Sequence, residues 1–124
     1  MEFTGITKVF SLADEQQYET IGQFWDELAA RYGLEKLQGL GYAWREGKIS
    51  YAIGFRHGTI PGADLHIQLP DEGWQRIRGR TEELKQLYDG LYRDGPLHYE
   101  IETFYEDGSC EICYYRADSA AKDR

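Results

Sequence analysis

The dipeptide Asp107-Gly108 lies between two segments of alternating pattern that are rich in aromatic residues. It constrains the fold more than any other feature of the chain. Asp-Gly favours a tight β-hairpin, because both residues tolerate the positive φ that such a turn requires. A two-residue turn would place Phe104 opposite Glu111 and Glu102 opposite Cys113. The sequence therefore predicts an antiparallel hairpin over residues 98–115.

Side chains alternate between the two faces of such a hairpin. In the register of a two-residue turn, one face holds Tyr99, Ile101, Thr103, Tyr105, Ile112 and Tyr114. The other face holds Glu100, Glu102, Phe104, Cys113 and Tyr115. Carboxylates mixed with aromatic rings suit a desolvated cation, so we expect this face to bind a ligand. The alternative is that the glutamates face solvent, which is the default for polar residues of an antiparallel sheet.

The first half of the chain has the element order β-α-β-β. Residues 3–10 read as a strand, and Ser11-x-x-Asp14 resembles a capping box for the helix that follows. Gly33 is a suitable C-terminal stop for that helix, and strands at 41–44 and 51–55 flank Glu46-Gly47-Lys48. The helix has one apolar face, made of Tyr18, Ile21, Trp25, Leu28 and Tyr32.

The second half repeats this order. Residues 74–78 read as a strand, Thr81 can cap a helix, Gly95-Pro96 ends it, and the Asp-Gly hairpin follows. Residues 64–69 add an extended segment. The apolar stripe of this helix consists of Leu84, Leu87, Tyr88, Leu91 and Tyr92.

Two β-α-β-β units predict an α+β fold, with an antiparallel sheet, two helices on one face and a ligand groove on the other. At 124 residues the chain is long enough for one core. We expect a single domain over 1–116, with halves of about 1–60 and 61–116, and a polar tail over 117–124.

The hairpin around Glu46-Gly47 leaves two interpretations open. One face would hold Tyr42, Trp44, Tyr51, Ile53 and Phe55, and the other Gly41, Ala43, Ser50, Ala52 and Gly54. Either the large side chains pack against the helices, or they line the groove and hold a cation between aromatic rings and a carboxylate. Trp74 is a further candidate for this lining.

The formal net charge of −8 argues against direct nucleic-acid binding and would attract cationic ligands. We expect a cytoplasmic protein, because Met1-Glu2-Phe3-Thr4 lacks the features of a signal peptide and the apolar runs are too short to cross a bilayer. Cys110-x-x-Cys113 would place its sulfurs on opposite faces of a strand, which favours a structural role. The three histidines show no metal-ligand spacing, and no nucleotide-binding motif is present, so we expect no metal or cofactor.

Taken together, these segments resemble the GyrI-like small-molecule-binding domain, which is also the effector-binding domain of multidrug-responsive bacterial transcription activators. The resemblance covers roughly residues 3–116. It rests on Ile21-Gly22-Gln23-Phe24-Trp25-Asp26-Glu27-Leu28, Leu40-Gly41-Tyr42-Ala43-Trp44, Ile67-Gln68-Leu69-Pro70 with Gly73-Trp74, and Ile101-Glu102-Thr103-Phe104 followed by Asp107 and residues 111–115.

This resemblance implies that Glu102 is the pocket glutamate that meets the cationic part of lipophilic drugs. Glu100 is the alternative, because a shift of two residues keeps the same face. The sequence departs from the family pattern at two places. Phe104 replaces the tyrosine that is usual in the family, and the last strand ends in Tyr114-Tyr115-Arg116 rather than in an Ile-Pro-Val-like sequence.

Three functions are compatible with this resemblance. The first is a stand-alone domain, with no room for a DNA-binding helix-turn-helix, that binds hydrophobic or cationic aromatic molecules through Glu102, Phe104, Trp44, Tyr42 and Tyr51. The second is hydrolysis of cyclopropane-containing genotoxins, with Glu102 as general acid/base and a tyrosine that the sequence does not identify. The third is a DNA gyrase inhibitor or adaptor, although the acidic residues are dispersed along the chain.

Overall fold

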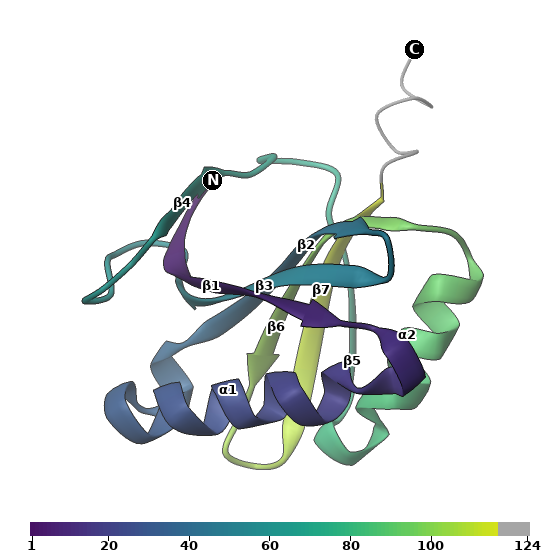
Figure 1. Cartoon of the computed structure of the whole chain (residues 1–124), viewed down its shortest axis with the longest axis horizontal. Helices are drawn as coiled ribbons and strands as arrows, with labels where there is room; N and C mark the ends of the chain where they lie inside the picture. The colour runs from purple at the N-terminus through teal and green to yellow at the C-terminus, as the bar shows by residue number, and fades with distance from the viewer. Residues whose placement is uncertain (117–124) are drawn as a thin grey trace.

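Seven antiparallel strands form one sheet in the order β4-β1-β3-β2-β6-β7-β5 (Figure 1). The computed structural model describes residues 1–116, so the expected tail over 117–124 lies outside the described residues. The strands are β1 (Glu2–Ser11), β2 (Gln38–Arg45), β3 (Lys48–Phe55), β4 (Leu65–Gln68), β5 (Gln75–Arg80), β6 (Leu97–Phe104) and β7 (Ser109–Arg116). The helices are α1 (Gln17–Tyr32) and α2 (Leu84–Arg93), with 3-10 turns at Ala13–Glu15, Leu34–Lys36 and Thr81–Glu83.

The element order confirms the α+β class and the duplicated layout. The first unit is β1-α1-β2-β3 and the second is β5-α2-β6-β7, with β4 added at the edge beside β1. The two units meet at the centre of the sheet, where β2 pairs with β6. The middle of the sheet is therefore built from equivalent strands of the two halves.

Both helices cover the same face of this sheet. One row of directly paired residues crosses the central strands: Ile53, Gly39, Glu102 and Ile112. Ile53 packs in a cluster with side chains of α1, and Ile112 packs in a cluster with side chains of α2. Because paired residues share a face, α1 and α2 lie on the same side.

The β6–β7 hairpin forms as expected, but its register differs by one residue. The connecting loop is closed by hydrogen bonds from the Tyr105 amide to the Ser109 carbonyl and from the Gly108 amide to the Tyr105 carbonyl. Only Gly108 has a positive φ, of 86°, as in a three-residue turn. Phe104 consequently pairs with Cys110. Because a shift of one residue reverses the faces of a strand, Cys113 and Tyr115 lie on the face opposite Glu102.

The β2–β3 hairpin has the expected turn and an unexpected bulge. Glu46 and Gly47 have φ values of 50° and 74°, as a tight hairpin turn requires. Ala43 also has a positive φ, of 53°, where the pairing shifts between Tyr42 and Arg45. The bulge interrupts the alternation of side chains between the two faces of β2. Gly41 therefore pairs with Tyr51, and Tyr42 lies on the opposite face from Tyr51 rather than beside it.

The expected N-terminal caps of both helices are absent. Ser11 accepts a hydrogen bond from the Ala13 amide at 3.1 Å, and α1 begins only at Gln17, without a side-chain cap. Thr81 lies in a 3-10 turn, where Glu83 accepts from the Arg80 amide at 3.0 Å instead. Gly33, with φ of 84°, ends α1 as expected.

Candidate ligand pocket

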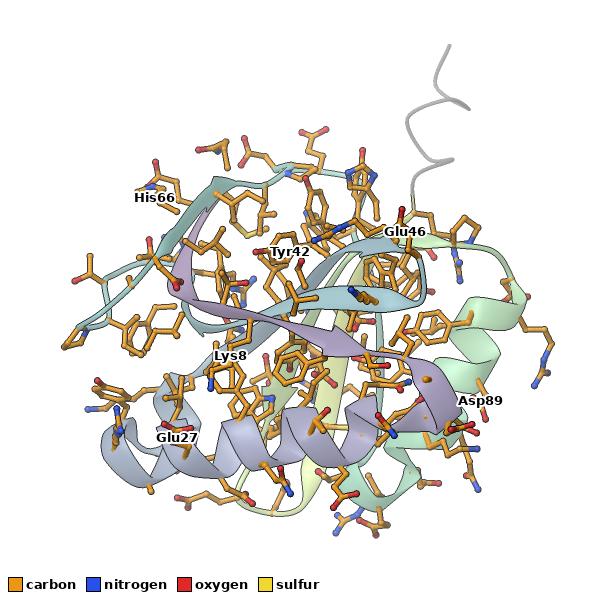
Figure 2. The ribbon with its side chains drawn as sticks, in the orientation of Figure 1. Lys8, Glu27, Tyr42, Glu46, His66 and Asp89 are labelled. Atoms are coloured by element: carbon orange, nitrogen blue, oxygen red, sulfur yellow. The ribbon has the colours of Figure 1, made fainter. Side chains whose placement is uncertain are left out.

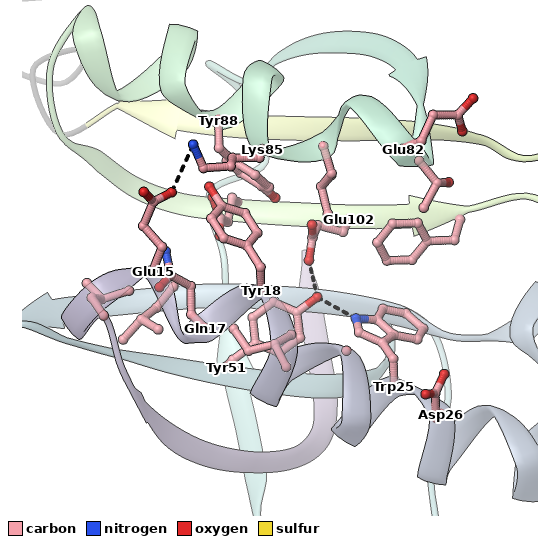
Figure 3. A pocket seen from close by; sticks show the side chains of 18 of the residues that line it. Glu15, Gln17, Tyr18, Trp25, Asp26, Tyr51, Glu82, Lys85, Tyr88 and Glu102 are labelled. Atoms are coloured by element: carbon pink, nitrogen blue, oxygen red, sulfur yellow. Dashed lines mark hydrogen bonds and ion pairs between the residues drawn. The ribbon is translucent and has the colours of Figure 1, made fainter.

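A cavity of about 740 Å³ opens between the two helices, above the central strands (Figure 3). Helix α1 packs on β1 and β3, and helix α2 packs near the other edge, on β5. The cavity lies between these contacts and is lined by side chains of α1, α2, β3 and β6, so it forms on the helix-bearing face. The expectation of a groove on the opposite face is therefore wrong.

The floor of the cavity is polar and its walls are aromatic. Tyr51 comes from β3, and Glu100, Glu102 and Phe104 come from β6. The aromatic wall residues are Tyr18 and Trp25 of α1 and Tyr88 and Tyr92 of α2.

Glu102 ends a short chain of buried hydrogen bonds. Only 4% of its surface is exposed, and its carboxylate accepts a hydrogen bond from the Tyr51 hydroxyl. That hydroxyl in turn accepts from Trp25 Nε1 at 2.8 Å, as the dashed lines in Figure 3 indicate. The chain joins α1, β3 and β6, and it holds the Glu102 carboxylate at the floor of the cavity.

Two glycines of β2 make room for these side chains. Gly39 pairs with Glu102, and a Cβ at Gly39 would lie 1.9 Å from the Tyr51 hydroxyl oxygen. Gly41 pairs with Glu100, and a Cβ there would lie 2.6 Å from a Glu100 carboxylate oxygen. Both distances are shorter than real Cβ contacts, so a larger residue would force Tyr51 or Glu100 to shift, and β2 is the strand over which these two side chains extend.

Glu100 is as deeply buried as Glu102 but has weaker hydrogen bonding. Its surface is 3% exposed, and it accepts one hydrogen bond, from the Tyr92 hydroxyl at 3.4 Å. The Tyr88 hydroxyl is buried nearby and makes no hydrogen bond with the described residues. The cavity therefore retains hydrogen-bonding capacity that its own side chains leave unused.

Burial changes the acidity of the whole cluster. Desolvation raises the pKa of Glu100 well above its usual value, and the neighbouring Glu102 charge raises it further. Burial also raises the pKa of Glu102, while the Tyr51 hydrogen bond partly opposes that rise. Burial and the nearby carboxylates raise the pKa of Tyr18 to about 12. The tyrosine hydroxyls thus remain neutral donors at physiological pH.

Within residues 1–116, no basic side chain forms an ion pair with Glu100 or Glu102. Lys85 lies at the rim, but it pairs with Glu15 at 3.1 Å and with Asp89 at 3.5 Å. An unpaired carboxylate is costly to bury. The site is therefore short of positive charge.

Four of the sequence-predicted residues line the cavity: Glu100, Glu102, Phe104 and Tyr51. Trp44 lies beside it instead, in a smaller cavity of about 250 Å³ that is also lined by Leu12, Gln17 and Tyr92.

The other four predicted residues belong to the opposite face of the sheet. Tyr42 contacts Thr7 there through a 2.7 Å hydrogen bond between their hydroxyls and lies on the side away from α1 (Figure 2). Trp74 packs against Tyr99 and Tyr115, with ring centroids 6.2 and 5.7 Å apart. Cys113 joins the same cluster. The bulge at Ala43 accounts for the position of Tyr42, and the register of β7 accounts for the positions of Cys113 and Tyr115.

The helix contribution to the pocket was missed by the sequence analysis. The sequence predicts Tyr18, Trp25, Tyr88 and Tyr92 as members of the apolar faces of the two helices, and the structure places them around the cavity. The sequence does contain a signal for this role, because tyrosine and tryptophan carry hydroxyl or indole N–H groups. Such groups can donate hydrogen bonds to buried carboxylates, which leucine side chains cannot do.

The described residues hold no cluster of three or more potential metal ligands. Cys110 and Cys113 are free thiols on opposite faces of β7. No helix among the residues described is long and apolar enough to span a membrane.

Comparison with known proteins finds similarity in structure but not in sequence. No family model matches the sequence, and no curated protein matches it. The structure of SAV2435 bound to tetraphenylphosphonium superposes with a TM-score of 0.62 and 12% identity, over 92% of this chain and 87% of that chain. A protein from Staphylococcus aureus MU50, described as a candidate bacterial transcription regulation protein, superposes with a TM-score of 0.64 and 16% identity, over 92% and 90% of the two chains. At such low identity the likeness concerns the fold, and it agrees with the GyrI-like fold expected from the sequence.

Proposed function

We propose that the pocket binds lipophilic organic cations, and that the protein senses or sequesters such drugs or toxins. The observation that carries this proposal is the pair of fully buried carboxylates, Glu100 and Glu102, in an aromatic cavity without a basic partner among residues 1–116. A cationic ligand would supply the missing charge, and the rings would attract it through their quadrupoles.

The size and the composition of the cavity support a ligand of drug size. Pockets for such molecules measure about 300–1,000 Å³ and combine apolar walls with a few polar groups, and this cavity measures about 740 Å³. The structural neighbour SAV2435 was solved with a cationic aromatic compound, tetraphenylphosphonium. That ligand belongs to the neighbour, and it supports the same ligand class for this chain.

A fluorescence-anisotropy titration with a rhodamine dye, a cationic aromatic probe, tests the proposal. We expect saturable binding to the wild type and at least a tenfold loss of affinity in Glu102→Gln, or about 1.4 kcal/mol. Gln keeps the shape of the side chain and removes its charge.

The matched control is Glu111→Gln. Glu111 is also buried, but it lies on the opposite face of the sheet and pairs with Arg78 at 2.8 Å. Equal dye affinity in the two variants, or no saturable binding to the wild type, would contradict the proposal.

One contact favours hydrolysis of cyclopropane-containing genotoxins as a second candidate function. The Tyr51 hydroxyl and the Glu102 carboxylate are hydrogen bonded inside the cavity, and this pair could act on a carbonyl-conjugated cyclopropane. Glu102 would take a proton from water as the water oxygen bonds to a ring carbon and a ring C–C bond breaks. Tyr51 would donate to the carbonyl oxygen that gains electron density.

Turnover separates the two functions. A hydrolase consumes many equivalents of a cyclopropyl ketone conjugated to an aromatic system, and Tyr51→Phe slows it at saturating substrate. If consumption stops at one equivalent per protein, the enzymatic function is excluded and the binding function remains.

A further inference from the structure

The cavity contains two buried glutamates, whereas a ligand with one positive charge can neutralise only one of them. Glu100 and Glu102 are two residues apart on β6 and therefore point to the same face. Their Cα atoms are roughly 6.6 Å apart, at 3.3 Å per strand residue. Each is almost completely buried, and each lines the same cavity.

The two carboxyl groups have unequal hydrogen-bonding partners. Glu102 accepts from Tyr51, whose hydroxyl is oriented by Trp25. Glu100 accepts only the 3.4 Å bond from Tyr92. Because donors stabilise the ionised form, Glu102 is the group that carries the first negative charge.

Among residues 1–116, no basic side chain pairs with either glutamate. Lys85 lines the same cavity but is paired with Glu15 and Asp89, and the other charged lining residues, Glu15, Asp26 and Glu82, are acidic. The titratable groups that face the two glutamates are Tyr18 from α1, Tyr51 from β3, Tyr88 and Tyr92 from α2, and Cys110 from β7. All of these are neutral acids. Two adjacent buried carboxylates repel each other, so the empty pocket favours a proton on Glu100.

We propose that Glu100 is a second anchor that exchanges its proton for the second charge of a dicationic ligand. A monocation is held against Glu102 while Glu100 stays protonated. A dication with its charges separated by about the spacing of the two glutamates contacts both, and the Glu100 proton passes to solvent. This inference rests on the proposed function, and it names the dicationic aromatic compounds as a ligand class of the same pocket.

Two biaryl cations of similar shape test the charge dependence. N-methyl-4-phenylpyridinium carries one permanent charge, and N,N′-dimethyl-4,4′-bipyridinium carries two, one at each end of the same ring system. Neither compound titrates, so any proton released on binding comes from the protein or from a change in its groups.

Isothermal titration calorimetry in two buffers of different ionisation enthalpy, at one pH, measures the protons released. On the wild type, we expect the dication to release about one proton more than the monocation. The affinity for the dication should also rise roughly tenfold more per pH unit than that for the monocation, wherever Glu100 is protonated. In Glu100→Gln, both differences between the ligands should disappear.

A measurement on the empty protein is independent of ligand. Infrared spectroscopy at neutral pH should reveal a protonated-carboxyl band that Glu100→Gln removes and that the control Glu111→Gln retains.

The possible failures are distinguishable. If the monocation binds but the dication does not, or if both release the same number of protons, the inference is overturned and the proposed function stands. If neither the dye nor either biaryl cation binds the wild type, the proposed function and the inference fall together. An empty protein without the protonated-carboxyl band also overturns the inference, whatever binds.

Discussion

The two halves of the molecule share one order of elements but contribute opposite features to the sheet centre, where they meet. Strand β2 contributes Gly39 and Gly41, and the equivalent strand β6 contributes Glu102 and Glu100 directly opposite them. The glycines leave open the volume that Tyr51 and Glu100 fill. The repeated order of elements therefore builds the sheet, and the pocket depends on the residues that differ between its two central strands.

The largest effect is expected from removing that difference with Gly39→Ala. The new Cβ would lie 1.9 Å from the Tyr51 hydroxyl oxygen and 2.5 Å from its ring carbon Cζ, so the rigid ring must move. We expect a loss of about 1–3 kcal/mol in the free energy of unfolding through overpacking. Dye affinity should fall at least tenfold, or about 1.4 kcal/mol, because the Tyr51–Glu102 hydrogen bond is displaced. Urea unfolding and the anisotropy titration measure the two effects.

Gly90→Ala is the control for this substitution. Gly90 lies within α2, and a Cβ there would meet nothing within 4 Å, so alanine should stabilise the helix by up to about 1 kcal/mol. If Gly39→Ala were as stable as Gly90→Ala and bound the dye as the wild type does, the spatial role of Gly39 would be wrong.

A second comparison, between glutamates on the two faces, predicts opposite effects of pH on stability. Burial raises the pKa of Glu100, so the folded protein keeps this proton to a higher pH than the unfolded chain. Its contribution is fully present below the usual glutamate pKa of about 4.3 and is lost as pH rises toward the folded pKa. Arg78 lowers the pKa of Glu111, so its contribution is present above the usual pKa and is lost as pH falls.

Urea unfolding of Glu100→Gln and Glu111→Gln across the pH range measures this contrast. Relative to the wild type, Glu100→Gln should gain stability as pH rises above about 4.3, whereas Glu111→Gln should lose stability as pH rises toward that value. Slopes of the same sign in both variants would contradict the assigned environments.

The smallest effects are expected from a pair of tryptophans, one on each face. Trp25→Phe removes the hydrogen bond to Tyr51, which is worth about 1 kcal/mol, and should weaken dye binding by about threefold to tenfold. Trp74→Phe removes a 2.7 Å hydrogen bond to the Pro70 carbonyl on the other face. It should change dye affinity by less than about twofold, since distant sites act independently. A larger loss of dye affinity in Trp74→Phe than in Trp25→Phe would indicate that the binding site lies on the other face.

The sequence predicted the frame of the fold because its signals are local. Gly33 ends a helix, Glu46-Gly47 makes a tight turn, and the Asp107-Gly108 hairpin forms in the expected place. Each of these depends on a few neighbouring residues whose backbone preferences are strong.

The assignment of faces was less predictable, because one residue reverses it. The three-residue turn before Ser109 moved Cys113 and Tyr115 to the far face, and the bulge at Ala43 separated Tyr42 from Tyr51. The bulge has no strong signal in the sequence, since a non-glycine residue rarely adopts the positive φ of Ala43. The position of the pocket depends on where two helices pack on the sheet, which no short segment specifies.

The most direct test of the account is a crystal structure of the protein with a bound organic cation such as tetraphenylphosphonium. The expected result is a ligand between α1 and α2, with its positive centre beside Glu102 and its rings against Tyr51 and Trp25. A ligand on the opposite face, against Trp74 and Tyr115, would contradict the central claim that the helix-bearing face carries the binding site.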